Sequence, residues 1–430
     1  SNMFANIKQI FSPKHKDLRK RILFTLSCLL VFVIGKAIVV PGIPKVQLTG
    51  NLGFFEFFNV MNGGSLGNFS IFALGVMPYI SASIIVQFLE MDIIPYFSDL
   101  AKEGYTGRQK LNKITRIMGI ALAFAQGYLY SFMYLGKTAG PTDYLLYSLV
   151  LTAGTAFLLW MSDQMTSKGV GNGMSLLIMA GIVASLPSTF IGAYKSFITS
   201  GTFGNIWGIV LFIVFILLYF LIIIGIIFVD NAERRVTIQY SNKSGSVFTK
   251  DNYIPFKLNS AGVMPVILAS AFISIPGMIA GAINKPGFTK FYENWISYNS
   301  VTGFILYMTL IIAFGYFYTF YIQLKPKDVA ENLQKNGGYI PGVRPGENTT
   351  KYINDVLKRI TLVGTLSLAV LAAIPILFTA VTKISDSNIS LGGTGLLIAV
   401  GVALETYKQI ESEIVSKNYQ KGRRRWKVLF

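Results

Sequence analysis

Apolar runs of membrane-spanning length recur along almost the whole chain. A helix needs about 20 apolar residues to cross the roughly 30 Å hydrocarbon core of a bilayer. Hydrophobic residues occupy 52% of the 430 positions and charged residues only 13%, too few to give a soluble protein its polar surface. The sequence therefore predicts an all-α, polytopic membrane protein with ten spans, at about 22–40, 69–89, 114–135, 144–162, 174–194, 206–229, 260–282, 302–323, 360–381 and 394–410.

The basic residues gather at one end of these spans. Of the 38 Lys and Arg residues, 31 fall in the two terminal segments and in every second connection, counting the adjoining span ends. Cytoplasmic loops carry such an excess, so both termini are predicted to be cytoplasmic and the net charge of +18 to reflect orientation rather than nucleic-acid binding. The segments 1–21 and 413–430 are then basic cytoplasmic ends, and the second is explained by binding to anionic lipid headgroups.

One nine-residue segment occurs twice. Gly75–Ser83 and Gly262–Ser270 are identical at seven of nine positions, and each lies in an apolar run together with a Gly and a Pro. A second pair, Leu176–Ile178 and Leu396–Ile398, follows a Gly-rich turn late in each half. Internally repeated halves with the working path between them are common in membrane transport proteins. We therefore predict two five-span halves, 22–200 and 201–412.

The spans hold almost no chemistry. No Asp, Glu, Lys or Arg lies at the centre of a predicted span, and the chain has one histidine, His15, and one cysteine, Cys28. Metal sites and histidine acid/base catalysis therefore have almost no residues to use, so we expect no enzyme activity, no metal and no cofactor. Gly169–Gly173 resembles part of a phosphate-binding loop but is interpreted as a tight turn. An inverted-repeat solute transporter remains the alternative, although charge-free span centres weigh against it.

Three connections differ from plain loops. A run at 54–61 is too short to cross the bilayer, and it is either a re-entrant half-helix or an interfacial aromatic anchor. The loop 230–259 predicts a hairpin with strand-like runs at 236–240 and at 247–248. In the loop 324–359, prolines and glycines fix a rigid turn with Arg344 at its tip. Both loops are interpreted as a docking surface for a large partner, with simple connectors as the alternative.

Apolar side chains occupy matching places in the two repeated segments. Val76 and Ile80 are four residues apart and share a helix face, as do Ile267 and Ala271. With Ile178 and Ile398 from the second repeated pair, they could meet as a ring that excludes water and ions. Lipid-facing or packing bulk is the alternative interpretation of each residue.

Four segments, in this order, match a known family: 68–80, 169–175, 255–265 and 341–347. They make the chain resemble the SecY family, the channel subunits of the bacterial Sec protein translocase, which is related to the alpha subunit of the eukaryotic endoplasmic-reticulum translocon. The resemblance covers essentially the whole chain.

The resemblance implies a protein-conducting channel in the bacterial plasma membrane. Two inverted halves would be hinged like a clamshell, with an hourglass pore and a lateral opening toward lipid between the second and seventh spans. Unfolded secretory polypeptides would pass the pore, while signal sequences and membrane segments would leave sideways. The implied partners are the small membrane subunits SecE and SecG, the motor ATPase SecA and the ribosome, together with the anionic lipids expected above.

The resemblance also assigns roles to particular residues. The pore ring falls on the six apolar residues named above, of which Ala271 is a small member. Ser81, Gln126 and Asn259 correspond to a polar cluster at the lateral gate, which would favour closure. Arg234, Arg235 and Arg344 fall in loops offered to SecA or the ribosome, although the single Lys243 at the first loop's tip is less basic than in many relatives. The plug would consist of Phe54, Phe55, Glu56, Phe57, Phe58, Asn59, Val60 and Met61.

Overall fold

The chain divides into two compact units, which are described one at a time. Unit 1 comprises Ser1–Thr189, Gly277–Lys285 and Val402–Phe430, and unit 2 comprises Phe190–Pro276 and Pro286–Gly401. The computed structural model describes residues 3–11, 13–42, 69–90, 94–135, 140–201, 203–240, 253–283, 285–297, 300–320, 326–383 and 387–428. The predicted plug at 54–61 and the predicted strand at 247–248 lie outside these residues.

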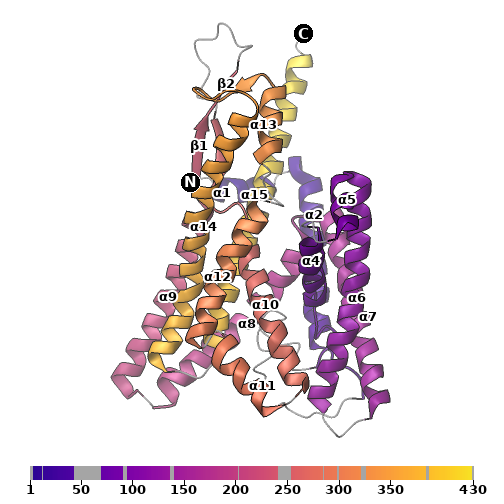
Figure 1. Cartoon of the computed structure of the whole chain (residues 1–430), viewed down its shortest axis with the longest axis vertical. Coiled ribbons are helices and arrows are strands. Elements are labelled where there is room, and N and C mark those ends of the chain that lie inside the picture. The colour runs from indigo at the N-terminus through magenta and orange to yellow at the C-terminus, as the bar shows by residue number, and fades with distance from the viewer. Residues whose placement is uncertain are drawn as a thin grey trace. The chain divides into compact units, whose positions relative to one another are not determined.

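In unit 1, two long helices pack side by side, α6 (Tyr105–Leu135) and α7 (Pro141–Lys168) (Figure 1). Gly140 and Pro141 begin α7, and the Asp143 carboxylate accepts the Gly140 N–H at 3.3 Å, which satisfies one of the amides that a helix start leaves free. α4 (Met77–Leu89) and the short α5 (Pro95–Lys102) pack on α6, and α2 (Lys16–Ala37) packs on α7. The remaining elements are α1 (Met3–Ile10), η1 (Pro13–His15), α8 (Gly173–Tyr194) up to Thr189, the end of α10 and α15 (Ser387–Val428) from Val402.

Unit 2 contains a group of apolar helices in which α14 (Glu347–Thr382) is central. α9 (Asn205–Asn231) and α12 (Val301–Tyr318) both pack on α14. Ser300 caps α12 by accepting the Gly303 N–H at 3.1 Å. The other helical elements are the π-helical turns η3 (Lys195–Thr199) and η4 (Tyr292–Ile296), α10 (Met264–Ile283) up to Pro276, α11 (Pro286–Phe291) and the first part of α15.

The two long loops of unit 2 form one small domain. β1 (Glu233–Thr237) pairs antiparallel with β3 (Tyr253–Lys257), and β2 (Gln239–Tyr240) pairs with β4 (Gly338–Tyr339) from the second loop. The amphipathic helix α13 (Pro326–Lys335) closes a core with the first turns of α14. This loop domain, 233–240, 253–257 and 326–360, has the core residues Val236, Ile238, Phe256, Ala330, Leu333, Ile340, Ile353, Val356, Leu357 and Ile360.

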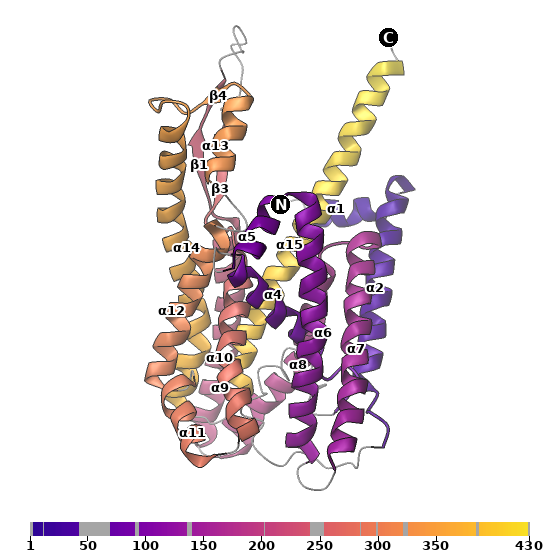
Figure 2. The ribbon, with the colours of Figure 1, turned by 45° about the vertical axis from the view of Figure 1, so that its right-hand side comes forward.

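Several predicted boundaries were wrong. The apolar runs at 69–89 and 260–282 were predicted to be helical throughout. Their helices begin only at Met77 and Met264, because a turn occupies the first residues of each run. At the chain ends, residues 16–21 belong to α2 and 413–428 to α15, so the basic segments are not separate from the helices (Figure 2). One buried residue of each segment, Leu18 and Ile414, packs with Val170.

Five described helices are long and apolar enough to cross a membrane by length and composition, and they are 141–168, 173–199, 205–231, 301–318 and 347–382. The two helices that follow the repeated turns are apolar but shorter, at 77–89 and 264–277.

Candidate functional site

The two copies of the repeated segment fold in the same way. Gly75 and Gly262 both have positive φ, 57° and 65°, which a glycine adopts without steric cost. Their N–H groups donate to the carbonyls of Phe72 and Asn259, at 3.0 and 3.3 Å. A helix begins two residues later in both copies, and Pro78 and Pro265 follow in the first turn, where a missing N–H costs nothing. The Gly and Pro of the repeat therefore start helices and do not interrupt spans.

This start places one isoleucine of each copy at the same point of a helix. The Ile80 N–H donates to the Val76 carbonyl at 3.2 Å, and the Ile267 N–H donates to the Val263 carbonyl at 3.3 Å. Both side chains are buried, at 7% and 3% exposure. Ile80 and Ile267 therefore occupy equivalent positions of their helices, one in each unit.

The other ring residues are also buried. Ile178 lies on α8 and, with Val76 and Ile80, belongs to unit 1. Ala271 on α10 and Ile398 on α15 belong to unit 2 with Ile267. Exposure of these side chains runs from 0% at Ile398 to 6% at Ile178. That the six side chains form one ring stays a prediction.

The predicted gate cluster is distributed over both units. Ser81 on α4 donates to its own helix, at 3.2 Å from the Met77 carbonyl. Gln126 lies half-buried on the neighbouring α6. Asn259 precedes α10 in unit 2 and is 6% exposed, and its side-chain nitrogen has no hydrogen-bond partner among the described residues. A buried amide of this kind is unfavourable until it finds an acceptor.

The three predicted docking arginines are exposed on the loop domain, but their surroundings differ. Arg235 on β1 pairs with Glu233 at 3.1 Å, and its guanidinium lies 4.6 Å from the Tyr253 ring centre. Neither Arg234 nor Arg344 has an ion pair with any residue that the structure describes. The backbone at Arg344 is held because its carbonyl accepts the Thr349 hydroxyl at 2.8 Å. Arg234 and Arg344 are therefore better placed than Arg235 to meet a partner.

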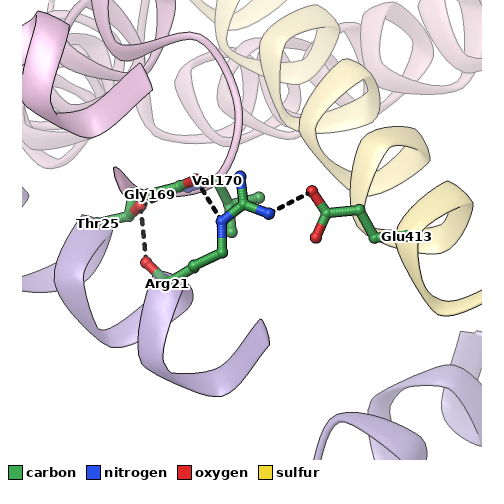
Figure 3. A network of polar contacts seen from close by, with 5 residues as sticks. All are labelled: Arg21, Thr25, Gly169, Val170 and Glu413. Atoms are coloured by element: carbon green, nitrogen blue, oxygen red, sulfur yellow. Dashed lines mark hydrogen bonds and ion pairs between the residues drawn. The ribbon is translucent and has the colours of Figure 1, made fainter. Parts of the chain in front are cut away.

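A polar network in unit 1 was not predicted from the sequence (Figure 3). Arg21 on α2 donates from Nε to the Gly169 carbonyl at 3.2 Å and from Nη1 to Glu413 Oε1 on α15 at 2.9 Å. The Thr25 hydroxyl donates to the Arg21 carbonyl and accepts the Val170 N–H at 2.9 Å. The turn at Gly169–Gly173 is thus a structural junction, as the tight-turn interpretation expects. No local sequence signal links Arg21 to a carboxylate so far along the chain.

Comparisons with known proteins agree with this fold along nearly the whole chain. A sequence model of SecY matches residues 70–407. The chain is 44% identical to "Protein translocase subunit SecY" of Bacillus licheniformis, over 97% of this chain and 99% of that protein. It is also 44% identical to the protein of that name from Bacillus subtilis, with the same coverage.

Solved structures share the fold at lower identity. A structure described as a protein conducting channel has a TM-score of 0.68 at 19% identity, and the canine Sec61 channel has 0.65 at 18%. Each match covers 93% of both chains. The predicted all-α polytopic architecture is confirmed, and the chain belongs to the SecY family.

Proposed function

We propose that this chain, a channel subunit of the Sec translocase by family, seals its resting pore with Val76, Ile80, Ile178, Ile267, Ala271 and Ile398. Proteins of this family are channels that pass secretory polypeptides, and this membership leaves the solute-transporter alternative without support. The observation that supports the seal is the equivalent placement of Ile80 and Ile267 by the two repeated helix starts. An apolar constriction of this kind loses its water and blocks ions without a specific substrate site.

The seal is tested by making its two equivalent members polar. Ile80→Asn combined with Ile267→Asn should let water persist at the constriction, so that reconstituted vesicles leak ions. The matched control is Ile85→Asn with Ile279→Asn, which places the same side chain at exposed positions of the same two helices. Unchanged conductance in the first pair, or an equal leak in the second, would remove Ile80 and Ile267 from the seal.

We infer that the loop domain docks the motor or the ribosome. Arg344 is exposed on a turn in which Gly342 and Gly346 have positive φ, and neighbouring Val343 packs on the domain's core. A pre-organised turn loses little entropy on binding, and a guanidinium can pair with a carboxylate through two hydrogen bonds. Ribosome-bound structures of a Sec61 channel and an Ssh1 complex share this fold and support the ribosome as one partner.

Arg344→Glu should abolish SecA- and ATP-driven export of a precursor into vesicles while leaving the ion seal intact. Arg344→Lys should rescue only partly, because lysine supplies charge without the planar fork. Lys351→Glu is the matched control, since Lys351 is an exposed cation of the same domain outside the turn. Export at the normal rate by Arg344→Glu would exclude this contact.

The remaining partners follow from exposed surfaces. α9 has exposed apolar side chains along its length, including Trp207, Leu217 and Phe228, which require lipid or other membrane helices around them. We propose that SecE and SecG supply such helices and that the channel is a multi-pass plasma-membrane protein with both termini cytoplasmic. Anionic lipids would meet the basic residues at the inner span ends.

A further inference from the structure

A buried hydroxyl in unit 2 joins three helices, and two of them carry predicted pore residues. Tyr307 on α12 is 3% exposed, and its OH lies 3.2 Å from Ser270 Oγ on α10. The same hydroxyl has a side-chain hydrogen bond with Thr394 on α15. Ser270 ends the second copy of the repeated segment, whereas Tyr307 and Thr394 lie outside the repeat, and none of the three belongs to the predicted gate cluster.

The partners of Tyr307 lie one helical turn or less from pore positions. Ser270 directly precedes Ala271 and follows Ile267 by three residues, so it shares a side of α10 with Ile267. Thr394 and Ile398 are four residues apart and therefore share a face of α15. A rotation of α10 that moved Ile267 would also have to move Ser270 away from Tyr307.

Two of the three helices are held by close packing. A Cβ added at Gly315 of α12 would overlap Thr365 of α14, and a Cβ added at Gly393 of α15 would overlap Pro375 of α14. α12, α14 and α15 thus form a closely packed frame that includes Tyr307 and Thr394. α10 meets this frame through Phe272, whose ring lies edge-on to Phe314, and through the Ser270 hydroxyl.

We propose that the Tyr307 hydroxyl is a positioning group that sets the rotation of α10, and with it the orientation of Ile267, in the closed channel. The proposal rests on the proposed function, because it takes Ile267, Ala271 and Ile398 as pore-lining. In a membrane interior, a hydroxyl pair of this kind can hold two helices in register and still be broken at small cost. Such a bond suits a helix that must turn when the channel opens.

Tyr307→Phe removes only the hydroxyl and is the main test. Cys28 is the chain's only cysteine, so in a Cys28→Ser background Ile267→Cys reports on α10 by its rate of labelling with a water-soluble maleimide in vesicles. Tyr307→Phe should raise the resting rate about threefold, the factor that corresponds to a typical interhelical hydrogen bond in a membrane. Ser270→Ala should give the same increase, while Ser270→Thr keeps a hydroxyl and should restore the original rate.

Two controls separate positioning from general loosening. Tyr316→Phe is the matched variant, because Tyr316 lies on the same helix but its OH donates to the Lys358 carbonyl on α14. It should leave labelling unchanged, and an equal increase would overturn the proposal. Ser270→Ala combined with Tyr307→Phe should not exceed either single change, since the Ser270–Tyr307 bond, the one that holds α10, is already lost in each single variant. Additive effects, or a rate unchanged by Tyr307→Phe and Ser270→Ala, would also overturn it.

The seal and the positioning group fail in different ways. If Ile80→Asn with Ile267→Asn leaks ions while Tyr307→Phe leaves labelling at residue 267 unchanged, the seal stands and the positioning role is wrong. If the polar pair does not leak, the seal is wrong whatever the labelling shows. Should Tyr307→Phe fail to fold, Ser270→Ala and Ser270→Thr on α10 decide the positioning role alone.

Discussion

The helix starts of α4 in unit 1 and α10 in unit 2 share more than their sequence. Ile38 ends α2 and Ala232 ends α9, and the carbonyl of each accepts a backbone N–H from the segment just before the turn. The donors are Ile71, at 3.0 Å from Ile38, and Leu258, at 2.9 Å from Ala232. The carbonyl of each donor lies against a glycine of a later helix, Gly154 of α7 at Ile71 and Gly364 of α14 at Leu258. A Cβ at either glycine would overlap that carbonyl oxygen. One backbone arrangement is therefore built twice from different side chains.

The copies differ at the residue whose carbonyl closes the turn. In unit 1 this is Phe72, which is buried and stacks near Phe32 and Phe157, with ring centres 6.1 and 5.8 Å away. In unit 2 it is Asn259, whose buried amide nitrogen has no partner among the described residues. Aromatic packing stabilises the first turn, while an unsatisfied amide destabilises the second by about 1–3 kcal/mol. The two turns therefore differ in how well the closing residue is packed and hydrogen-bonded.

The largest effect is expected where the two copies agree. Gly154→Ala and Gly364→Ala each place a Cβ against a backbone carbonyl that cannot move aside, so each should lower the free energy of unfolding by about 1–3 kcal/mol or more. Thermal unfolding of purified protein in detergent would measure this. Gly287→Ala in α11 is the control, because nothing lies within 4 Å of a Cβ at that position. If one glycine tolerates alanine and the other does not, the two starts are not equivalent.

The next largest effect on stability is expected at Phe72 and Asn259, the residues at which the two turns differ. Phe72→Leu loses ring stacking and leaves a cavity, so unfolding should occur at a lower temperature, by an amount corresponding to about 1–3 kcal/mol. Asn259→Leu removes the unsatisfied amide and should leave stability unchanged or raise it. If the amide instead bonds to Ser81 and Gln126 as predicted, the same change removes hydrogen bonds worth roughly 0.6–2 kcal/mol and should alter how hydrophobic a signal sequence must be for export.

These two outcomes can fail independently. Destabilisation by Asn259→Leu comparable to that of Phe72→Leu would mean that the Asn259 amide is satisfied in the folded protein. An unchanged hydrophobicity threshold across a graded signal series would make the polar cluster ordinary packing.

The sequence predicted the repeat but not the turn and backbone hydrogen bonds that start its two helices. Gly75 and Pro78 were visible signals for a helix start, yet the apolar run from Phe69 to Leu74 hid the turn, because hydropathy does not distinguish buried turns from helix. The carbonyls of Ile38 and Ala232 act through backbone atoms, which leave no trace in residue type. A Gly-Thr pair at 154–155 and 364–365 was available as a signal, but only its shared spatial role makes it a repeat.

The site residues were predictable to different degrees. The repeat is visible in the sequence, and it predicts that Ile80 and Ile267 occupy equivalent helix positions. Arg344 could be placed on an exposed turn from its flanking prolines and glycines. The contact of Arg235 with Tyr253 could not be predicted, because it depends on β1 pairing with β3 across residues that carry no pairing signal. Tyr307 was missed because a lone tyrosine in an apolar span is indistinguishable from packing until its partners are known.

The smallest expected effect concerns the threonine that follows each packing glycine. Thr155 is 1% exposed and its hydroxyl has no hydrogen-bond partner in the part of the chain that the structure describes, whereas the Thr365 hydroxyl donates to the Thr361 carbonyl at 2.7 Å. Valine has nearly the shape of threonine without the hydroxyl. Thr155→Val should therefore be neutral or slightly stabilising, because it removes a buried polar group, and Thr365→Val should cost about 0.5–1.5 kcal/mol for its lost bond. Opposite shifts in unfolding temperature would show that the two copies differ in polar satisfaction next to the glycines as well as at the turns. Equal shifts would confine the asymmetry to Phe72 and Asn259.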